Sequence, residues 1–103
     1  MKQNANPLET ILKLDPELYD QVSKTKNLAY ADKALPKKYA YLIALALDAS
    51  DGAENGVKNL AKMAMDSGAT KDEIASALRV VMYIKGVQGI YTAARALQDI
   101  VNE

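Results

Sequence analysis

The sequence DSGATKDEIASAL, residues 66–78, contains the end of one helix and the beginning of the next. Gly68 suits the left-handed backbone conformation with which many helices close. Thr70 and Glu73 have the spacing of a capping box, in which each side chain bonds the backbone N–H of the other residue. From Ile74 onward, apolar residues recur with helical spacing. This stretch therefore predicts a turn between two helices.

Similar signals recur on both sides of this turn. Upstream, Asp51 and Glu54 are spaced as a second capping box, which predicts that a helix begins there. Nearer the start of the chain, Asp15 followed by Pro16 predicts another helix start. Downstream, Gly86 weakens or bends the chain before a last helix. The apolar residues of that last helix are Ile90, Ala93, Ala94, Leu97 and Val101.

The segment YAYLIALAL, residues 39–47, is apolar on nearly all sides. This pattern is typical of a helix that is buried on several sides. A chain of this size buries only about 60–65% of the surface that its unfolded form exposes. We therefore expect neighbouring subunits to help bury this segment.

The whole sequence predicts an all-α protein. The sequence does not show the alternation of apolar and polar residues that indicates strands. It also has no linker segment and no internal repeat with a period typical of solenoid proteins. The helix signals predict a compact helical domain of about five to six helices. We expect residues 1–103 to form a single domain.

The amino-acid composition excludes several classes of chemistry. The sequence has no Cys, His, Trp or Phe, and its 13 basic side chains balance 13 acidic ones. Without Cys there is no disulfide, thiolate nucleophile or iron–sulfur ligand. Without His there is no imidazole base and no ordinary zinc site. Any chemistry must therefore use carboxylates, lysines, tyrosines, hydroxyls or a bound cofactor.

Charge and hydropathy also bear on partners and location. Balanced charge without a basic block argues against nucleic-acid binding. No apolar run approaches the roughly 20 residues that span a bilayer. The beginning of the sequence, MKQNANPLET, lacks the apolar core of a signal peptide. We expect a cytoplasmic protein with no nucleic-acid or membrane partner.

Two parts of the sequence together resemble the carboxymuconolactone decarboxylase and alkyl hydroperoxidase D-like (AhpD-like) family. The first is LDPELYDQV, and the second runs from LIALALDASDGAENG through NLAKMAMDSGATKDEIASAL. The resemblance covers roughly residues 14 to 100. It implies a compact all-helical unit that assembles as trimers or hexamers, with sites close to the subunit contacts.

The departures from the family pattern bear directly on activity. Redox-active members carry a Cys-x-x-Cys pair before the GAT turn, then a His, with an upstream Glu that assists the thiols. Counted back from Gly68, the cysteine positions fall on Ala53 and Gly56, the His on Leu60 and the Glu at about Tyr41. Ala and Gly can neither attack a disulfide nor resolve one. The resemblance thus implies a member without thiol peroxidase chemistry, for which peroxidase activity is only a family-level label.

Lys85 is the leading candidate for a functional side chain. It stands in the apolar stretch VVMYIKGVQGIY, next to Gly86. A desolvated lysine could act as a base, a Schiff-base amine or an anchor for a carboxylate. Alternatively, it is a favourable cation at a helix C-terminus whose stem lies on apolar surface.

Tyr41 and Glu54 are further candidates. Tyr41 occupies the family's Glu position and could donate to a ligand anion, although packing explains it as well. Glu54 could correspond to a carboxylate of the decarboxylase branch, whose His also falls on Leu60. Asp48, Asp51 and Glu54 are spaced three apart and could offer oxygen ligands, but helix capping accounts for them better. We predict no metal site and no cofactor.

Three functions remain open from the sequence. The first is a redox-inactive, oligomeric protein that binds a small anionic ligand through Lys85 and Tyr41. The second is a cofactor-free lyase or decarboxylase that acts on a small carboxylic acid or lactone through Lys85 or Glu54. The third is a purely structural or interaction protein, a helical oligomer without chemistry in a pocket.

Overall fold

The structure is a computed structural model that describes residues 6–102. All regular structure in this range is α-helical, so the predicted all-α class is confirmed. The chain divides into two compact units, residues 1–31 and residues 32–103. The expected single domain stays a prediction. The six helices are α1 (Leu8–Leu14), α2 (Pro16–Ala29), α3 (Lys37–Ser50), α4 (Glu54–Asp66), α5 (Lys71–Lys85) and α6 (Val87–Val101).

The first unit is a pair of helices, α1 and α2, joined at Asp15. The backbone N–H of Asp15 bonds to the carbonyl of Ile11 at 2.7 Å and so ends α1. The Asp15 side chain accepts the backbone N–H of Leu18 at 3.1 Å, and Pro16 takes the first position of α2. The predicted cap is confirmed, because one residue both closes α1 and opens α2.

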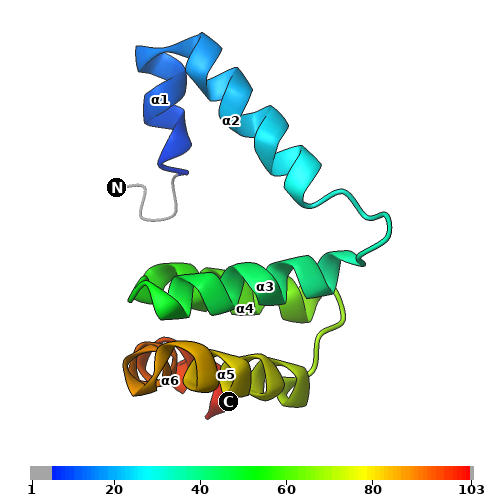
Figure 1. Cartoon of the computed structure of the whole chain (residues 1–103). Coiled ribbons are helices and arrows are strands. Elements are labelled where there is room, and N and C mark those ends of the chain that lie inside the picture. The colour runs from blue at the N-terminus through cyan, green and yellow to red at the C-terminus, as the bar shows by residue number, and fades with distance from the viewer. Residues whose placement is uncertain (1–5, 103) are drawn as a thin grey trace. The chain divides into compact units, whose positions relative to one another are not determined.

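The second unit is a bundle of the four helices α3 to α6 (Figure 1). Helices α3 and α5 run in one direction and α4 and α6 in the other, as short connections between successive helices require. Helix α3 packs most extensively on α4, both α4 and α5 pack on α6, and α3 also packs against α5 and α6.

The first two connections of the bundle are closed by the same turn. Gly52 and Gly68 both have positive φ, at 76° and 103°. The residue after each glycine donates its backbone N–H back into the helix, Ala53 to Asp48 at 2.8 Å and Ala69 to Ala64 at 2.9 Å. This is the Schellman arrangement, which suits glycine because a Cβ is unfavourable at such φ. The predicted role of Gly68 is confirmed.

The two helices that follow these turns begin differently. Thr70 and Glu73 form the predicted capping box at the start of α5, with both bonds at 3.0 Å. The capping box expected from Asp51 is wrong, because α4 has Ala53 at its N-cap and no side-chain cap. Asp51 is the C-cap residue of α3, and the turn at Gly52 leads directly to Ala53, the N-cap residue of α4. Asp51 therefore cannot occupy the N-cap position of α4. One additional residue, Thr70, separates the second turn from α5 and makes that cap possible.

Small side chains allow the four helices of the bundle to approach closely. A Cβ placed on Gly89 of α6 would lie 2.7 Å from Val81 Cγ1 and 3.2 Å from the carbonyl oxygen of Ala49, so glycine is required where α6 meets α3 and α5. The buried apolar core consists of Leu42, Leu45, Ala49, Val57, Ala61, Ala64, Ala69, Ile74, Val81, Ala93, Ala96, Leu97 and Ile100.

Candidate functional site

The first turn of α4 occupies the positions that the resemblance assigns to the thiol pair. Ala53 is the N-cap residue and Gly56 lies one turn into the helix. The Asp48 side chain, from the end of α3, lies against Gly56. A Cβ built on Gly56 would overlap the Asp48 carboxylate and lie 2.8 Å from its Cγ. No side chain, a cysteine included, fits at position 56 unless Asp48 moves.

The environment of Asp48 favours its protonated form. Burial against α4 raises the pKa of the Asp48 carboxyl above its ordinary value of 3.8, and the nearby negative charge of Asp51 raises it further. Sequence reasoning treated this residue only as a possible metal ligand and missed its contact with Gly56. The contact depends on how α3 packs on α4, for which the local sequence carries no signal. Within residues 6–102, no group of three acidic, His or Cys side chains is arranged to hold a metal ion.

Glu54 is engaged in an ion pair. Its Oε1 lies 3.0 Å from Nε of Arg95, and both side chains are about half exposed. The pair joins the start of α4 to the middle of α6, across 41 residues of sequence. The ion pair holds the Glu54 carboxylate in place as a hydrogen-bond acceptor. To act as a general base, Glu54 would first have to break its ion pair with Arg95.

Tyr41 and Leu60 are packing residues in the bundle. Both are half-buried and lie against the apolar core. These are the positions of the Glu and the His in redox-active members of the family that the sequence resembles. An aromatic and an aliphatic side chain therefore stand at these two positions in place of proton-transfer groups.

Lys85 lies in the last turn of α5 and is exposed. It lines a groove of about 290 Å³ between the C-terminal halves of α3 and α5, together with Ser50 and Asp51. The groove's apolar lining consists of Ala46, Leu47, Val80, Val81 and Ile84.

The structure does not gather the three candidate residues at one site. Lys85 lines the groove at the same end of α3 as Ser50, whereas Tyr41 is nine residues earlier on that helix, a distance of about 13 Å along its axis. Glu54 instead lies next to Arg95 of α6.

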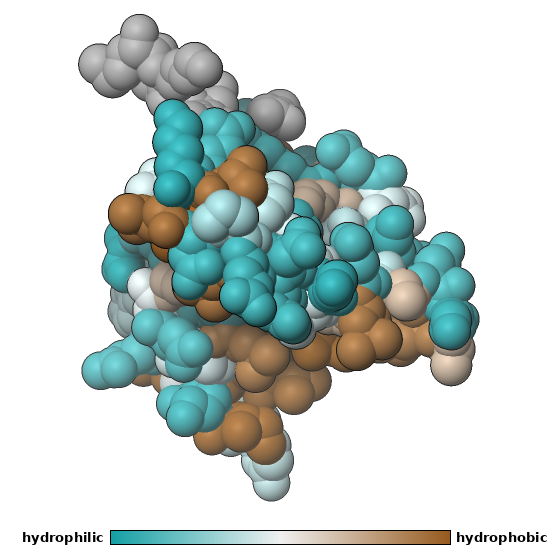
Figure 2. All heavy atoms as spheres, turned by 90° about the horizontal axis from the view of Figure 1, so that it is seen from above, coloured by the Kyte–Doolittle hydropathy of each residue, from teal (hydrophilic) through white to brown (hydrophobic). Residues whose placement is uncertain are grey.

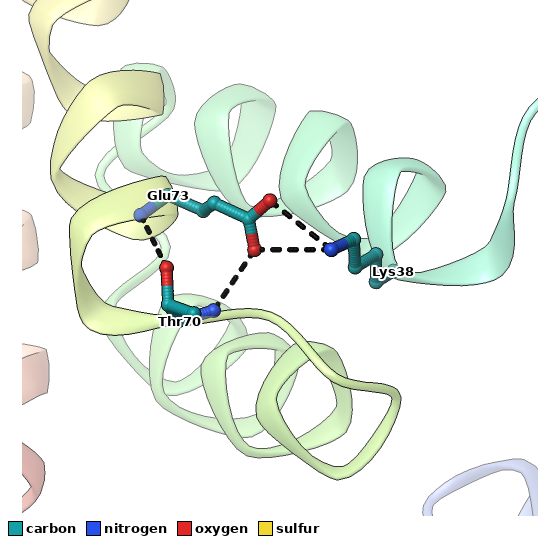
Figure 3. A network of polar contacts seen from close by, with 3 residues as sticks. All are labelled: Lys38, Thr70 and Glu73. Carbon is teal, nitrogen blue, oxygen red and sulfur yellow. Dashed lines mark hydrogen bonds and ion pairs between the residues drawn. The ribbon is translucent and has the colours of Figure 1, made fainter.

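The other ends of α3 and α5 are joined by a polar network (Figure 3). Lys38 Nζ lies 3.1 Å from Oε2 of Glu73, and Oε1 of the same carboxylate accepts the backbone N–H of Thr70 at 3.0 Å. The hydrogen bond to Glu73 raises the pKa of Lys38. The Thr70 N–H and then the Lys38 ammonium lower the pKa of Glu73. These interactions stabilise the ammonium of Lys38 and the carboxylate of Glu73, so the pKa of the lysine increases and that of the glutamate decreases.

An apolar surface extends along α3 and α5 from this network into the groove, which Leu47, Val80 and Ile84 also line. We call it the α3–α5 face and define it by Tyr39, Ile43, Leu47, Val80 and Ile84, which are 39–65% exposed. The space-filling view also shows groups of hydrophobic side chains at the surface (Figure 2). Among the described residues, no helix combines the length and the apolar character that a membrane crossing demands.

Comparison with known proteins finds one matching family. Its model, described as the carboxymuconolactone decarboxylase family, matches residues 16–99. Two uncharacterized proteins of Methanocaldococcus jannaschii are also similar to this chain. One is 30% identical over 99 residues, which is 96% of this chain and 92% of the relative. The other is 35% identical over 86 residues, with 82% and 83% covered.

Proposed function

We propose that this chain, which belongs to the carboxymuconolactone decarboxylase family, is a redox-inactive member that works as a self-associating binding protein. The observation that carries the proposal is the contact of Asp48 with Gly56 at the first turn of α4. The Asp48 carboxylate occupies the space that a cysteine side chain at position 56 would need. The sequence also contains no cysteine. We also propose a cytoplasmic location, since the chain has no thiols for an oxidising compartment to pair.

The α3–α5 face supports the self-association. The segment YAYLIALAL was expected to be buried on several sides, but Ile43 and Leu47 are 52% and 62% exposed in the isolated chain. Exposed apolar side chains that continue from one helix to its neighbour mark an interaction surface. We propose a homo-oligomer, with the trimer and the hexamer as the sizes implied by the family.

The groove beside Lys85 favours a second candidate, the binding of a small anionic ligand. Its volume of about 290 Å³ is near the lower end of ligand pockets, and Lys85 could hold a carboxylate. Asp51 and the C-terminal ends of α3 and α5 put negative charge at the same place. We therefore rank this candidate second, and Tyr41 has no part in it because it lies too far along α3.

The lyase hypothesis has less support. Glu54 is paired with Arg95, and Lys85 is exposed to solvent instead of being enclosed in an apolar pocket. It predicts slow turnover of a small lactone or β-keto acid that Glu54→Gln or Lys85→Met abolishes. Without such turnover by the unaltered protein, this hypothesis fails.

Two measurements on the whole protein test the proposal. Peroxide consumption with a dithiol reductant should not exceed the rate in buffer, and saturable peroxide turnover would contradict redox inactivity. A thermal-shift screen of small carboxylates then tests ligand binding, with Lys85→Met and the exposed Lys71→Met as a matched pair. A shift lost only in Lys85→Met supports the groove as the ligand site, whereas equal shifts in both variants contradict it.

A further inference from the structure

Two shallow hollows meet on the surface between α5 and α6. One has a volume of about 350 Å³ and lies along α6, and the other has a volume of about 300 Å³ and lies along α5. Leu78 and Ile90 line both hollows, which therefore form one continuous depression that we call the α5–α6 groove. Its volume is in the range of small-molecule sites. The other apolar residues that line it are Ala75, Met82, Ala94, Leu97 and Val101.

The α5–α6 groove is separate from the groove beside Lys85. On α5, residues 75, 78, 79 and 82 line the α5–α6 groove, whereas residues 80, 81, 84 and 85 line the groove that α5 shares with α3. Each set has the spacing of one helix face. The two grooves thus use different sides of α5, and a ligand in one leaves the other and the α3–α5 face free.

Arg79 lines the α5–α6 groove and is its one charged residue within the described part of the chain. The sequence has a second arginine, Arg95, which is paired with Glu54 at 3.0 Å. Arg79 is exposed and forms no ion pair within residues 6–102. Glu73 and Asp99, on the same two helices, are both paired with lysines. The guanidinium of Arg79 is therefore open to a carboxylate, whose two oxygens match its planar fork of donors.

The apolar part of the groove is elongated. Along α6 its lining residues extend from Ile90 to Val101, a distance of about 16 Å along the helix axis. Arg79 belongs to the hollow along α5, whereas Ala94 and Leu97 belong to the hollow along α6. The positive charge and most of the apolar track are thus at different parts of one groove, which suits a ligand with a carboxylate at one end and a hydrocarbon chain at the other.

We propose that the α5–α6 groove binds an unbranched aliphatic carboxylate of medium chain length. Arg79 holds the carboxylate, and the alkyl chain crosses Leu78 and Ile90 and continues towards Leu97. This site goes beyond the proposed function, in which a small anionic ligand is assigned to the groove beside Lys85.

Calorimetric titration of the whole protein with octanoate tests the role of Arg79. Arg79→Met should raise the Kd for octanoate about tenfold, because it removes the charge-assisted hydrogen bonds to the carboxylate. Arg95→Met makes the same change at the other arginine and should leave the Kd unchanged. Arg79→Lys keeps the charge but loses the fork, so it should recover part of the loss. Binding of octanol, which has no carboxylate, should be equal in all four proteins.

Chain length and a filled hollow test the apolar track. A methylene that is half-buried in an open groove should lower the Kd about twofold, so octanoate should bind about fourfold more tightly than hexanoate. Ala94→Trp fills the hollow along α6 and should remove this gain, whereas Gln88→Trp on the same helix lies outside the groove and should preserve it. Both positions are exposed, and circular dichroism verifies that each variant is folded.

The outcomes separate this inference from the proposed function. The inference is overturned if octanoate does not bind at millimolar concentration, binds equally to Arg79→Met, or binds no better than hexanoate. Loss of binding in Lys85→Met alone would place the ligand in the other groove, which overturns this inference and supports the second candidate function. A lower mass of Ala94→Trp in sedimentation velocity would show that another copy of the chain occupies the α5–α6 groove, which also overturns it. Saturable peroxide turnover contradicts the proposed function and leaves this inference intact.

Discussion

The carboxylate of Asp48 lies against the backbone of Gly56, so that the end of α3 and the first turn of α4 meet without a side chain between them. This turn contains the positions that the family resemblance assigns to the thiol pair, Ala53 and Gly56. Here the same place holds an acidic group whose pKa is raised by its burial. The proposed redox inactivity is thus supported by a specific packing contact as well as by the absence of cysteine.

Gly56→Ala should destabilise the protein, although alanine normally favours a helix. The new Cβ would overlap the Asp48 carboxylate, and because this flexible side chain can rotate away, the cost should be about 0.5–1.5 kcal/mol. Urea unfolding measures the loss. In an Asp48→Ala background the overlap is gone, and Gly56→Ala should then be neutral or stabilising. An equal loss in both backgrounds would show that Asp48 is not the cause.

Asp48→Asn should change how stability depends on pH. Because the folded pKa of Asp48 is raised above 3.8, its favourable contribution is complete below pH 3.8 and is lost as the pH rises through the folded value. The variant cannot ionise, so its stability relative to the unaltered protein should increase from pH 4 to pH 7. Unfolding curves across this range measure the difference, and a constant difference would refute the assignment.

Glu73→Gln should have the opposite pH dependence. Its pKa is lowered from 4.5, so its contribution is present above pH 4.5 and is lost as the pH falls through the folded value. The variant should therefore unfold at lower urea than the unaltered protein at pH 7, with the gap closing under acid conditions. Lys38→Met should weaken the same dependence, because it removes the ammonium that helps to lower the pKa of Glu73. A gap independent of pH would contradict the role of Lys38 and Thr70.

Leu45 and Leu47 should respond differently to truncation. Leu45 is fully buried, and Leu45→Ala leaves a cavity that costs about 2–5 kcal/mol. Leu47 lies on the α3–α5 face, so Leu47→Ala should affect the stability of the subunit little and its association strongly. Unfolding at two protein concentrations separates these effects. A large loss for Leu47→Ala that is independent of concentration would contradict the account.

The local features of the fold were predictable from the sequence because short-range chemistry determines them. The cap at Asp15, the capping box of Thr70 and Glu73 and the closing Gly68 each involve residues within a few positions of one another. The prediction for Asp51 was wrong for an equally local reason. A capping-box spacing cannot indicate whether its first residue still belongs to the preceding turn.

The site geometry was not predictable because it depends on packing between helices. The pairs Glu54–Arg95 and Lys38–Glu73 cross 41 and 35 residues of sequence. Arg95 and Lys38 carry no motif that would identify their partners. The contact of Asp48 with Gly56 likewise requires the angle between α3 and α4. The sequence showed which residues stand at the positions that the resemblance assigns to the thiol pair, and the structure showed that Asp48 packs against one of them, Gly56.

The mass of the unaltered protein in solution tests the central claim most directly. Native mass spectrometry at micromolar concentration should give a homo-oligomer, with three or six copies as the sizes implied by the family. Exclusive observation of the monomer, at this concentration and at one a hundredfold higher, would contradict the account of a self-associating member of the family.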